Sequence, residues 1–195
     1  MAIQRRAVRT RGALVRAAAA EFDEAGYEGA RLSHISELAD VSMGALTFHF
    51  PAKAALADAV EEEGLALARA LVERLSEGRT TGLEAVIELT VGLVELLEED
   101  LVVRSSVRLA RERPGGAGRW TGVWLPAVRE QLRLVCAEEV REVAADLVVY
   151  LLAGAESQVR AALAVSGGPV AGGGVAERLG HIWRLALSGV LVSDG

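Results

Sequence analysis

The chain has 195 residues, of which 51% are hydrophobic, 25% are charged and only 4% are aromatic. This composition excludes wholesale disorder, and the length excludes a large multidomain assembly. The net charge of −6 at pH 7 argues, taken alone, against a nucleic-acid partner. The apolar residues are mostly Ala, Val and Leu, which suit packed helices better than β-sandwiches.

Three features of the sequence concern the location of the protein. Its longest apolar stretch, residues 147–155, is far shorter than the roughly 20 residues that span a bilayer. No apolar run follows the arginines near the N-terminus, so no secretory signal is expected. The single cysteine, Cys136, allows no intrachain disulfide and fits a reducing compartment. We therefore expect a cytoplasmic protein with no membrane partner.

The charge is distributed unevenly along the chain. Residues 1–53 hold seven basic and six acidic groups, a net of +1, which leaves −7 for the remainder. Residues 1–16 contain five arginines and no acidic residue. A basic N-terminal arm on an acidic body predicts local contact with phosphate groups. A solvated arm without a partner is the alternative interpretation.

Helical periodicity begins near Thr10. Residues 10–25 repeat apolar side chains at three- and four-residue spacing, and Gly26 follows as a stop signal. Residues 32–39 predict a short second helix, and residues 42–48 predict a third with Ser42 as its N-cap. A longer helix followed by two short helices and a tight turn is a helix-turn-helix arrangement.

The rest of the chain is also predicted to be helical. Pro51 stands at a plausible first-turn position of a long helix over residues 52–76, and the Thr81–Glu84 capping box begins a fifth helix. Later helices are expected over residues 102–113, from between Trp120 and Pro126 to 135, over 143–165 and over 175–191.

These elements predict an all-α fold of about nine helices, with no strand pairs. A helix-turn-helix head is expected over residues 5–53, and a separate helical body over residues 54–195. The glycine-rich segments 115–118 and 167–174 follow no predicted strand, so they are interpreted as connectors rather than phosphate-binding loops.

No group of residues suggests catalysis. The three histidines, His34, His49 and His181, are isolated, so no zinc site is expected. The acidic runs 61–63 and 98–100 are interpreted as solvated surface. We therefore expect no enzyme activity, no metal and no cofactor.

The predicted third helix carries the candidate site. The second helix of a helix-turn-helix enters the major groove with its first residues near the base edges. Its exposed positions and the residues just beyond, most of them small, polar or basic, are Ser42, Met43, Gly44, Thr47, His49 and Lys53. Ordinary packing of a short glycine-containing helix is the alternative.

The stretch Val41–Val60 resembles the DNA-binding signature of TetR-family transcriptional regulators, and Phe22–Gly29 resembles the end of that family's first helix. The segments Arg9–Arg11, Phe48–Phe50 and Val102–Leu109 further resemble the γ-butyrolactone receptor branch, which regulates antibiotic production. The resemblance is specific in the head and weaker in the body.

The resemblance implies a homodimeric, helix-turn-helix repressor that leaves double-stranded operator DNA when a small apolar signal, such as a γ-butyrolactone, enters the body. By this resemblance Ser42, Met43 and Gly44 face bases, and Thr47, His49 and Lys53 face phosphates. The residues that approach the duplex from the N-terminal arm are Arg5, Arg9 and Arg11.

The resemblance also implies a ligand site in the body. Trp124 best matches the tryptophan that lines the pocket in this branch, because Val128 follows it as expected, and Trp120 is the second candidate. A buried tryptophan without a ligand role is the alternative.

The sequence departs from the branch at positions that matter for DNA recognition. Met43 stands where a basic residue is usual, Thr47 replaces a tyrosine, Asp40 a glycine and Arg31 a hydroxyl cap. Aspartate tolerates the left-handed turn conformation, so Asp40 need not break the motif. Met43 and Thr47 remove a charge and a large phosphate donor, so we expect an operator that differs from the usual one of this branch.

Two alternative functions remain. One is a regulator of the same fold that senses an antibiotic or its precursor, or senses no ligand. The other is a helical enzyme or binding protein that has kept the head as a relic. The identity of the ligand, the operator and the direction of regulation stay open.

Overall fold

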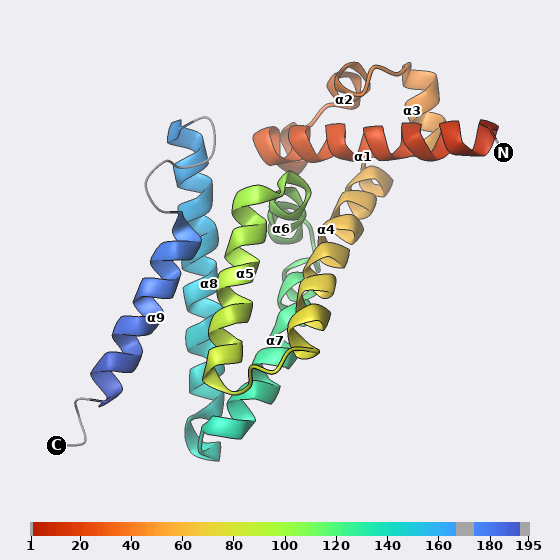
Figure 1. The fold of residues 1–195 in the computed structure, drawn as a ribbon. Coiled ribbons are helices and arrows are strands. Elements are labelled where there is room, and N and C mark those ends of the chain that lie inside the picture. Colours follow the sequence, from red (N-terminus) through yellow and green to blue (C-terminus); the bar gives the residue numbers. More distant parts are fainter. Residues whose placement is uncertain (1, 167–173, 192–195) are drawn as a thin grey trace. The chain divides into compact units, whose positions relative to one another are not determined.

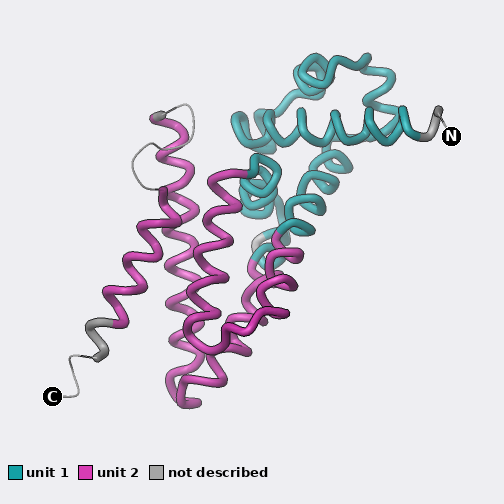
Figure 2. Tube along the Cα trace, in the orientation of Figure 1, with its two compact units in different colours: residues 1–67, 100–120 teal, residues 68–99, 121–195 magenta. Residues whose placement is uncertain are grey.

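The computed structural model describes residues 2–166 and 174–191. These residues form nine helices and no strands (Figure 1), which confirms the predicted all-α fold. The chain contacts define two compact units (Figure 2). Unit 1 comprises residues 1–67 and 100–120, and unit 2 comprises residues 68–99 and 121–195.

Unit 1 is built from three complete N-terminal helices, one complete later helix and parts of two others. They are α1 (Ala2–Gly29), α2 (Leu32–Leu38), α3 (Met43–His49), α4 (Lys53–Ser76) as far as residue 67, α6 (Leu101–Glu112) and the start of α7 (Ala117–Val135). Its core joins residues of α1, α2, α3, α4 and α6. These units divide the chain by compactness, whereas the boundary expected at residue 53 divides it by function. The functional boundary therefore stays a prediction.

Helix α1 is longer than the apolar periodicity indicates. It begins at Ala2 rather than near Thr10, so the basic arm is part of a helix. Residues 2–9 are rich in alanine, glutamine and arginine, which favour helix without needing an apolar face. The predicted stop at Gly26 is confirmed by its φ of 73°, a left-handed conformation that glycine adopts readily.

The end of α1 is held by α6. Arg108 donates to the carbonyl oxygens of Asp23 and Glu24, and Glu112 accepts the N–H of Tyr27 at 2.6 Å. A side chain at position 26 would lie 2.8 Å from both Arg108 and Glu112, so glycine is also required there for space. Helix α1 therefore ends where α6 supplies hydrogen-bond donors for the last carbonyls of α1.

Unit 2 contains the remainder of α4 and α7 together with three further helices. These are α5 (Leu83–Glu99), α8 (Glu138–Ser166) and α9 (Val175–Leu191). Helix α5 packs against both α8 and α9 (Figure 1). The indole N–H of Trp183 on α9 donates to the buried Thr90 hydroxyl on α5 at 3.0 Å.

Several predicted helix starts in this part of the chain were wrong. Helix α7 begins at Ala117, so Pro126 lies inside it rather than near its first turn, and α8 begins at Glu138 rather than Val143. The Thr81–Glu84 capping box does not form within the described residues. Instead Gly82, with φ 66°, precedes α5, and its N–H donates to Gln131 of α7 at 2.8 Å.

One described helix, over residues 138–165, is long and apolar enough by length and composition to cross a membrane, although a core helix of a soluble protein passes the same test. The uninterrupted apolar stretch in the sequence, residues 147–155, is shorter than this helix because charged residues flank it on both sides. The exposed side chains of this helix include Val143, Leu147 and Tyr150. Their spacing of four and three residues places them on one face of α8.

Candidate functional site

The turn between α2 and α3 gives the helix-turn-helix its geometry. Val41 donates its N–H to the Ser36 carbonyl at 3.0 Å, and Asp40 adopts a φ of 52°. This left-handed conformation confirms that aspartate can stand at this position. Ser42 then caps α3 as predicted, because its Oγ accepts the N–H of Ala45 at 3.2 Å.

Helix α2 is capped by a side chain of α1. Arg31 occupies its N-cap position without a side-chain cap. The buried carboxylate of Glu21 accepts the Arg31 N–H at 2.9 Å and bonds His34 Nδ1 at 2.5 Å. Burial raises the pKa of Glu21, but the hydrogen bonds from Arg31 and His34 and their positive charges outweigh it and hold the pKa below 4.5. Glu21 therefore fixes the start of α2 to α1.

Helix α3 has one buried and one exposed side. Leu46 is fully buried, and Phe50, at the C-cap, is 3% exposed. Met43, Gly44 and Thr47 are exposed, as predicted for a helix that presents its first residues to a partner. The structure thus brings these three predicted residues together with Ser42 on one surface.

The hydroxyl of Thr47 is already engaged within α3. It donates toward the carbonyl oxygens of Met43 and Gly44, at 3.0 and 3.2 Å. The half-buried ring of His49 makes an edge contact with Phe48, with ring centres 5.4 Å apart. Phe48 itself is 83% exposed, which sequence reasoning did not single out.

The N-terminal half of α1 and the α2–α3 turn line an open groove of about 1200 Å³. It is basic: the lining includes Arg5, Arg6, Arg9 and Arg16, with Asp40 as the acidic residue. Residues 5, 9 and 16 recur at intervals of four and seven, so they share one face of α1. We call this feature the arginine groove. Arg5 and Arg9 were predicted as site residues, whereas Arg6 and Arg16 were missed, although helical spacing of the charges could have found Arg16.

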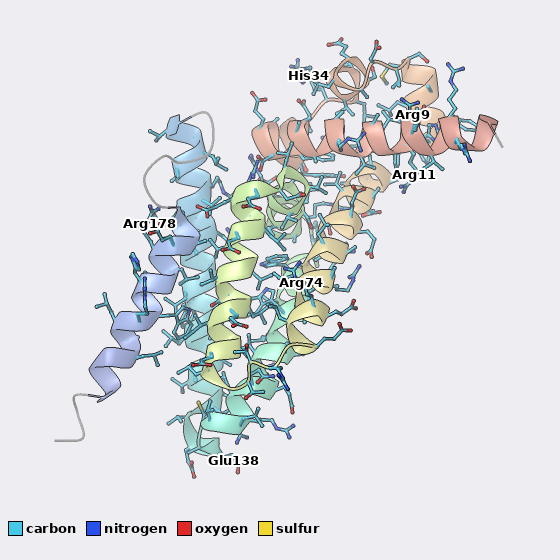
Figure 3. The ribbon with its side chains drawn as sticks, viewed as in Figure 1. Arg9, Arg11, His34, Arg74, Glu138 and Arg178 are labelled. Carbon is cyan, nitrogen blue, oxygen red and sulfur yellow. The ribbon has the colours of Figure 1, made fainter. Side chains whose placement is uncertain are left out.

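Two other predicted basic residues have partners inside unit 1. Arg11 lies two residues from Arg9, on another face of α1, and its guanidinium is 5.1 Å from the centre of the Phe50 ring (Figure 3). The Lys53 ammonium donates to two carbonyls at the end of α1, at 3.0 and 3.1 Å, and lies 4.9 Å from the centre of the Tyr27 ring. Both residues thus hold α1 against its neighbours, and their contact with DNA stays a prediction.

The acidic run at residues 61–63 is not wholly solvated, contrary to expectation. Glu61 is 1% exposed, and its carboxylate bonds Arg113 and Arg119. Arg113 also bonds Asp58 at 2.6 Å. Burial lowers the pKa of Arg113, but its hydrogen bonds and ion pairs with Asp58 and Glu61 outweigh burial and raise it. This cluster joins α4 to the end of α6 and the start of α7.

The two candidate tryptophans of α7 are both buried, Trp120 at 5% and Trp124 at 1% exposure. The indole N–H of Trp124 has no hydrogen-bond partner among the described residues. Trp183, in contrast, donates to Thr90. Val128, one turn after Trp124, is fully buried as well. A buried donor without a partner costs free energy, so the orphan N–H of Trp124 marks it as a candidate ligand contact.

Among the described residues, no group of three or more His, Cys, Asp or Glu side chains comes close enough to hold a metal ion. His34 lies on α2 (Figure 3), and its ring bonds the carboxylate of Glu21. The candidate contact residues lie in two places: the surface formed by α3 and the arginine groove, and the buried side chains of α7. These features define a helical protein with a helix-turn-helix head.

Comparison with known proteins agrees with this class. Residues 14–60 match the family described as bacterial regulatory proteins of the tetR family. Over 136 residues, 69% of this chain, the sequence is 37% identical to the A-factor receptor protein of Streptomyces griseus. The matched stretch spans 47% of that relative, so the chain covers about half of its length.

Solved structures give the same result. A gamma-butyrolactone receptor described as ArpA-like is 30% identical, with a TM-score of 0.67 and coverage of 79% of this chain and 80% of that chain. CprB of Streptomyces coelicolor, solved with its biological operator sequence, is 33% identical, with a TM-score of 0.65 and coverage of 82% and 86%. The chain belongs to the TetR family and resembles its gamma-butyrolactone receptors.

Proposed function

We propose that this protein is a DNA-binding transcriptional regulator that responds to a small apolar ligand. The observation that carries the proposal is the exposed side of α3 beside the arginine groove. A helix-turn-helix docks its second helix in the major groove, and arginines beside it bind phosphates. The residues assigned to DNA contact are Ser42, Met43, Gly44, Thr47, His49, Lys53, Arg5, Arg9 and Arg11. We further propose that the protein is a repressor and that the ligand releases it from operator DNA.

The orphan N–H of Trp124 supports the ligand site. Pockets for small apolar ligands are lined mainly by hydrophobic and aromatic groups, with few polar groups that fix orientation. A lactone carbonyl is an acceptor that the indole N–H would satisfy. The gamma-butyrolactone receptors and the A-factor receptor among the relatives favour a γ-butyrolactone as the ligand class. A regulator that senses an antibiotic, its precursor or no ligand is the second candidate.

An apolar stripe on α8 supports a homodimer. Val140, Val143, Leu147 and Tyr150 are 53%, 68%, 51% and 71% exposed, and their spacing places them on one face. Exposed contiguous apolar surface marks an interface. We propose that this stripe packs against the same stripe of a second copy, so that two heads are presented to one operator and α8 does not lie in a membrane.

The primary test is specific binding to promoter DNA. We expect the purified protein to bind at least one promoter fragment from its own host more tightly than a shuffled duplex, measured by fluorescence anisotropy at physiological salt. Size-exclusion chromatography with light scattering should give a dimer. If the protein binds every promoter fragment and the shuffled duplex with equal affinity at physiological salt, the DNA-binding proposal is refuted.

The ligand site has its own test. Trp124→Phe keeps an aromatic ring but removes the N–H, so we expect unchanged operator affinity and a higher γ-butyrolactone concentration for release. Trp183→Phe is the matched control, because its N–H already has Thr90 as a partner. A Trp124→Phe protein that releases operator at the same ligand concentration as the wild type would contradict the assignment.

A further inference from the structure

We infer that the exposed side of α3 recognises operator DNA through the methyl groups of thymine rather than through hydrogen bonds to guanine, adenine or cytosine. This inference rests on the proposed DNA binding and adds to it the kind of base that is read. It follows from which side chains α3 exposes and from what each of them can donate or accept.

The exposed side chains of α3 form one continuous face. Met43 and Thr47 are one turn apart, as are Gly44 and Phe48, while Leu46 points into the core of unit 1. Met43 is 42% exposed and Phe48 is 83% exposed. A Cβ added at Gly44 would lie 3.9 Å from the Ser42 Oγ, an ordinary van der Waals distance, so space remains there for close approach of a base pair. We call Met43, Gly44, Thr47 and Phe48 the reading face.

The reading face lacks the groups that make two hydrogen bonds to a base. Guanine is read by arginine or lysine, adenine by asparagine or glutamine, and cytosine by glutamate or aspartate. None of these residue types occurs in α3 (Met43–His49). The Thr47 hydroxyl directs its hydrogen at carbonyls of α3, so it offers bases only acceptor capacity. The Oγ of Ser42 accepts the N–H of Ala45, so its O–H remains available as a donor beside this face.

What the reading face does offer is apolar surface. Met43 contributes a flexible thioether, Phe48 a ring and Thr47 a methyl group. The C5-methyl of thymine is the apolar feature that the major groove presents, and apolar side chains contact it. Burial of that methyl against Met43 also removes the exposed apolar surface of the methionine from water. The chemistry of the face and the chemistry of thymine are therefore complementary.

The arginine groove favours DNA over a protein as the occupant of this apolar face. The groove is lined by residues 39–41, which immediately precede Ser42, so it adjoins the start of α3. Its lining includes four arginines against one aspartate. An apolar protein surface would leave these charges unused, whereas a duplex supplies phosphates to the groove and thymine methyls to the reading face at the same time.

The experiment uses the full-length protein and the operator that it binds best. Each thymine of one half-site is replaced in turn by deoxyuridine, which keeps every hydrogen-bonding group and lacks only the methyl. Burial of one methyl-sized group corresponds to a change of about fourfold in affinity. We expect such a loss at one or two positions, and almost none at the other thymines.

Protein variants assign the effect to the reading face. Met43→Ala should bind thymine and deoxyuridine operators equally at its contact position, because the partner of the methyl is gone. Met43→Arg should shift the preference there toward guanine, which arginine reads. Leu38→Ala is the matched control: Leu38 is an exposed apolar residue outside α3, and this variant should keep the full deoxyuridine sensitivity. Circular dichroism verifies that each variant is folded.

The outcomes separate this inference from the proposed function. If the protein binds its operator specifically but tolerates deoxyuridine at every position, methyl readout is overturned and DNA binding stands. If Met43→Ala, Thr47→Ser and Phe48→Ala each keep the full sensitivity to deoxyuridine, the reading face does not contact the methyl and the inference is overturned as well. If the protein prefers no promoter over shuffled duplex, and instead captures a protein through α3, both the inference and the proposed function fall.

Discussion

Loss of the buried carboxylate at position 61 is expected to destabilise unit 1 strongly. The side chain of Glu61 is 2% exposed, and it lies between Arg113 and Arg119, whose side chains are 16% and 41% exposed. Glu61→Gln keeps the shape of the side chain but removes its charge. Two arginines then lose their shared anion in a site with little water.

The magnitude follows from the burial of each partner. Removal of one partner from a fully buried ion pair costs about 3–5 kcal/mol. Here Arg119 is partly solvated and Arg113 keeps Asp58, so screening reduces the cost to about 2–3 kcal/mol. For a chain of this size, 1 kcal/mol lowers the melting temperature by about 2–4 °C. We expect a decrease of roughly 5–10 °C.

The assay is thermal unfolding followed by circular dichroism, with Glu62→Gln as the matched control. Glu62 adjoins Glu61 in sequence and lies 3.7 Å from Arg119, but its side chain is 62% exposed. A surface pair of this kind contributes about 0–1 kcal/mol. The reasoning is refuted if Glu61→Gln melts within about 2 °C of both the wild type and Glu62→Gln.

Three further predictions follow from other contacts. Because the pKa of Glu21 is lowered in the folded protein, its carboxylate should stabilise the head above pH 4.5 and lose this effect as the pH falls through the lowered pKa. The free energies of unfolding of the wild type and Glu21→Gln, measured by denaturant titration, should therefore become similar in acid. Gly64→Ala should destabilise the protein by about 1–3 kcal/mol despite the better helix propensity of alanine, since its Cβ would lie 2.4 Å from that of Ser106. Urea unfolding measures the loss. Ser106→Gly in the same chain should recover only part of it, because this change relieves the clash but removes the hydrogen bond from Ser106 to the Glu61 carbonyl. Lys53→Ala should weaken binding to operator and shuffled duplex alike in anisotropy titrations. It should also lower the melting temperature, because the Lys53 ammonium bonds the carbonyl of Glu28 in α1 and that of Ala30 just after α1.

Much of the fold could be predicted because helical periodicity is local. The repeats of leucine, valine and alanine predicted each of the nine helices that residues 2–166 and 174–191 form, and Gly26 and Ser42 act as the end and cap signals that their residue types indicate. The start of α1 was missed because an arginine-rich segment has no apolar repeat. The start of α7 was misplaced because Pro126 is tolerated within the helix rather than near its beginning.

The candidate site was predictable in part. The exposure of Met43, Gly44 and Thr47 follows from their position in α3, which is a local property. The burial of Glu61 was not predictable, because its partners stand 52 and 58 residues away and the neighbouring glutamates are exposed. The structural contacts of Lys53 likewise depend on carbonyls more than twenty residues earlier in the chain.

The cap supplied to α2 by Glu21 has an evolutionary consequence. Glu21 accepts the backbone N–H of Arg31 and bonds the His34 side chain, so it requires a hydrogen-bonding side chain at position 34 but no particular side chain at position 31. Among homologues that keep an acidic residue at position 21, a donor at position 34 should therefore be common, while position 31 should accept many residue types. Where position 21 loses its acid, the histidine at position 34 should be replaced by other residues.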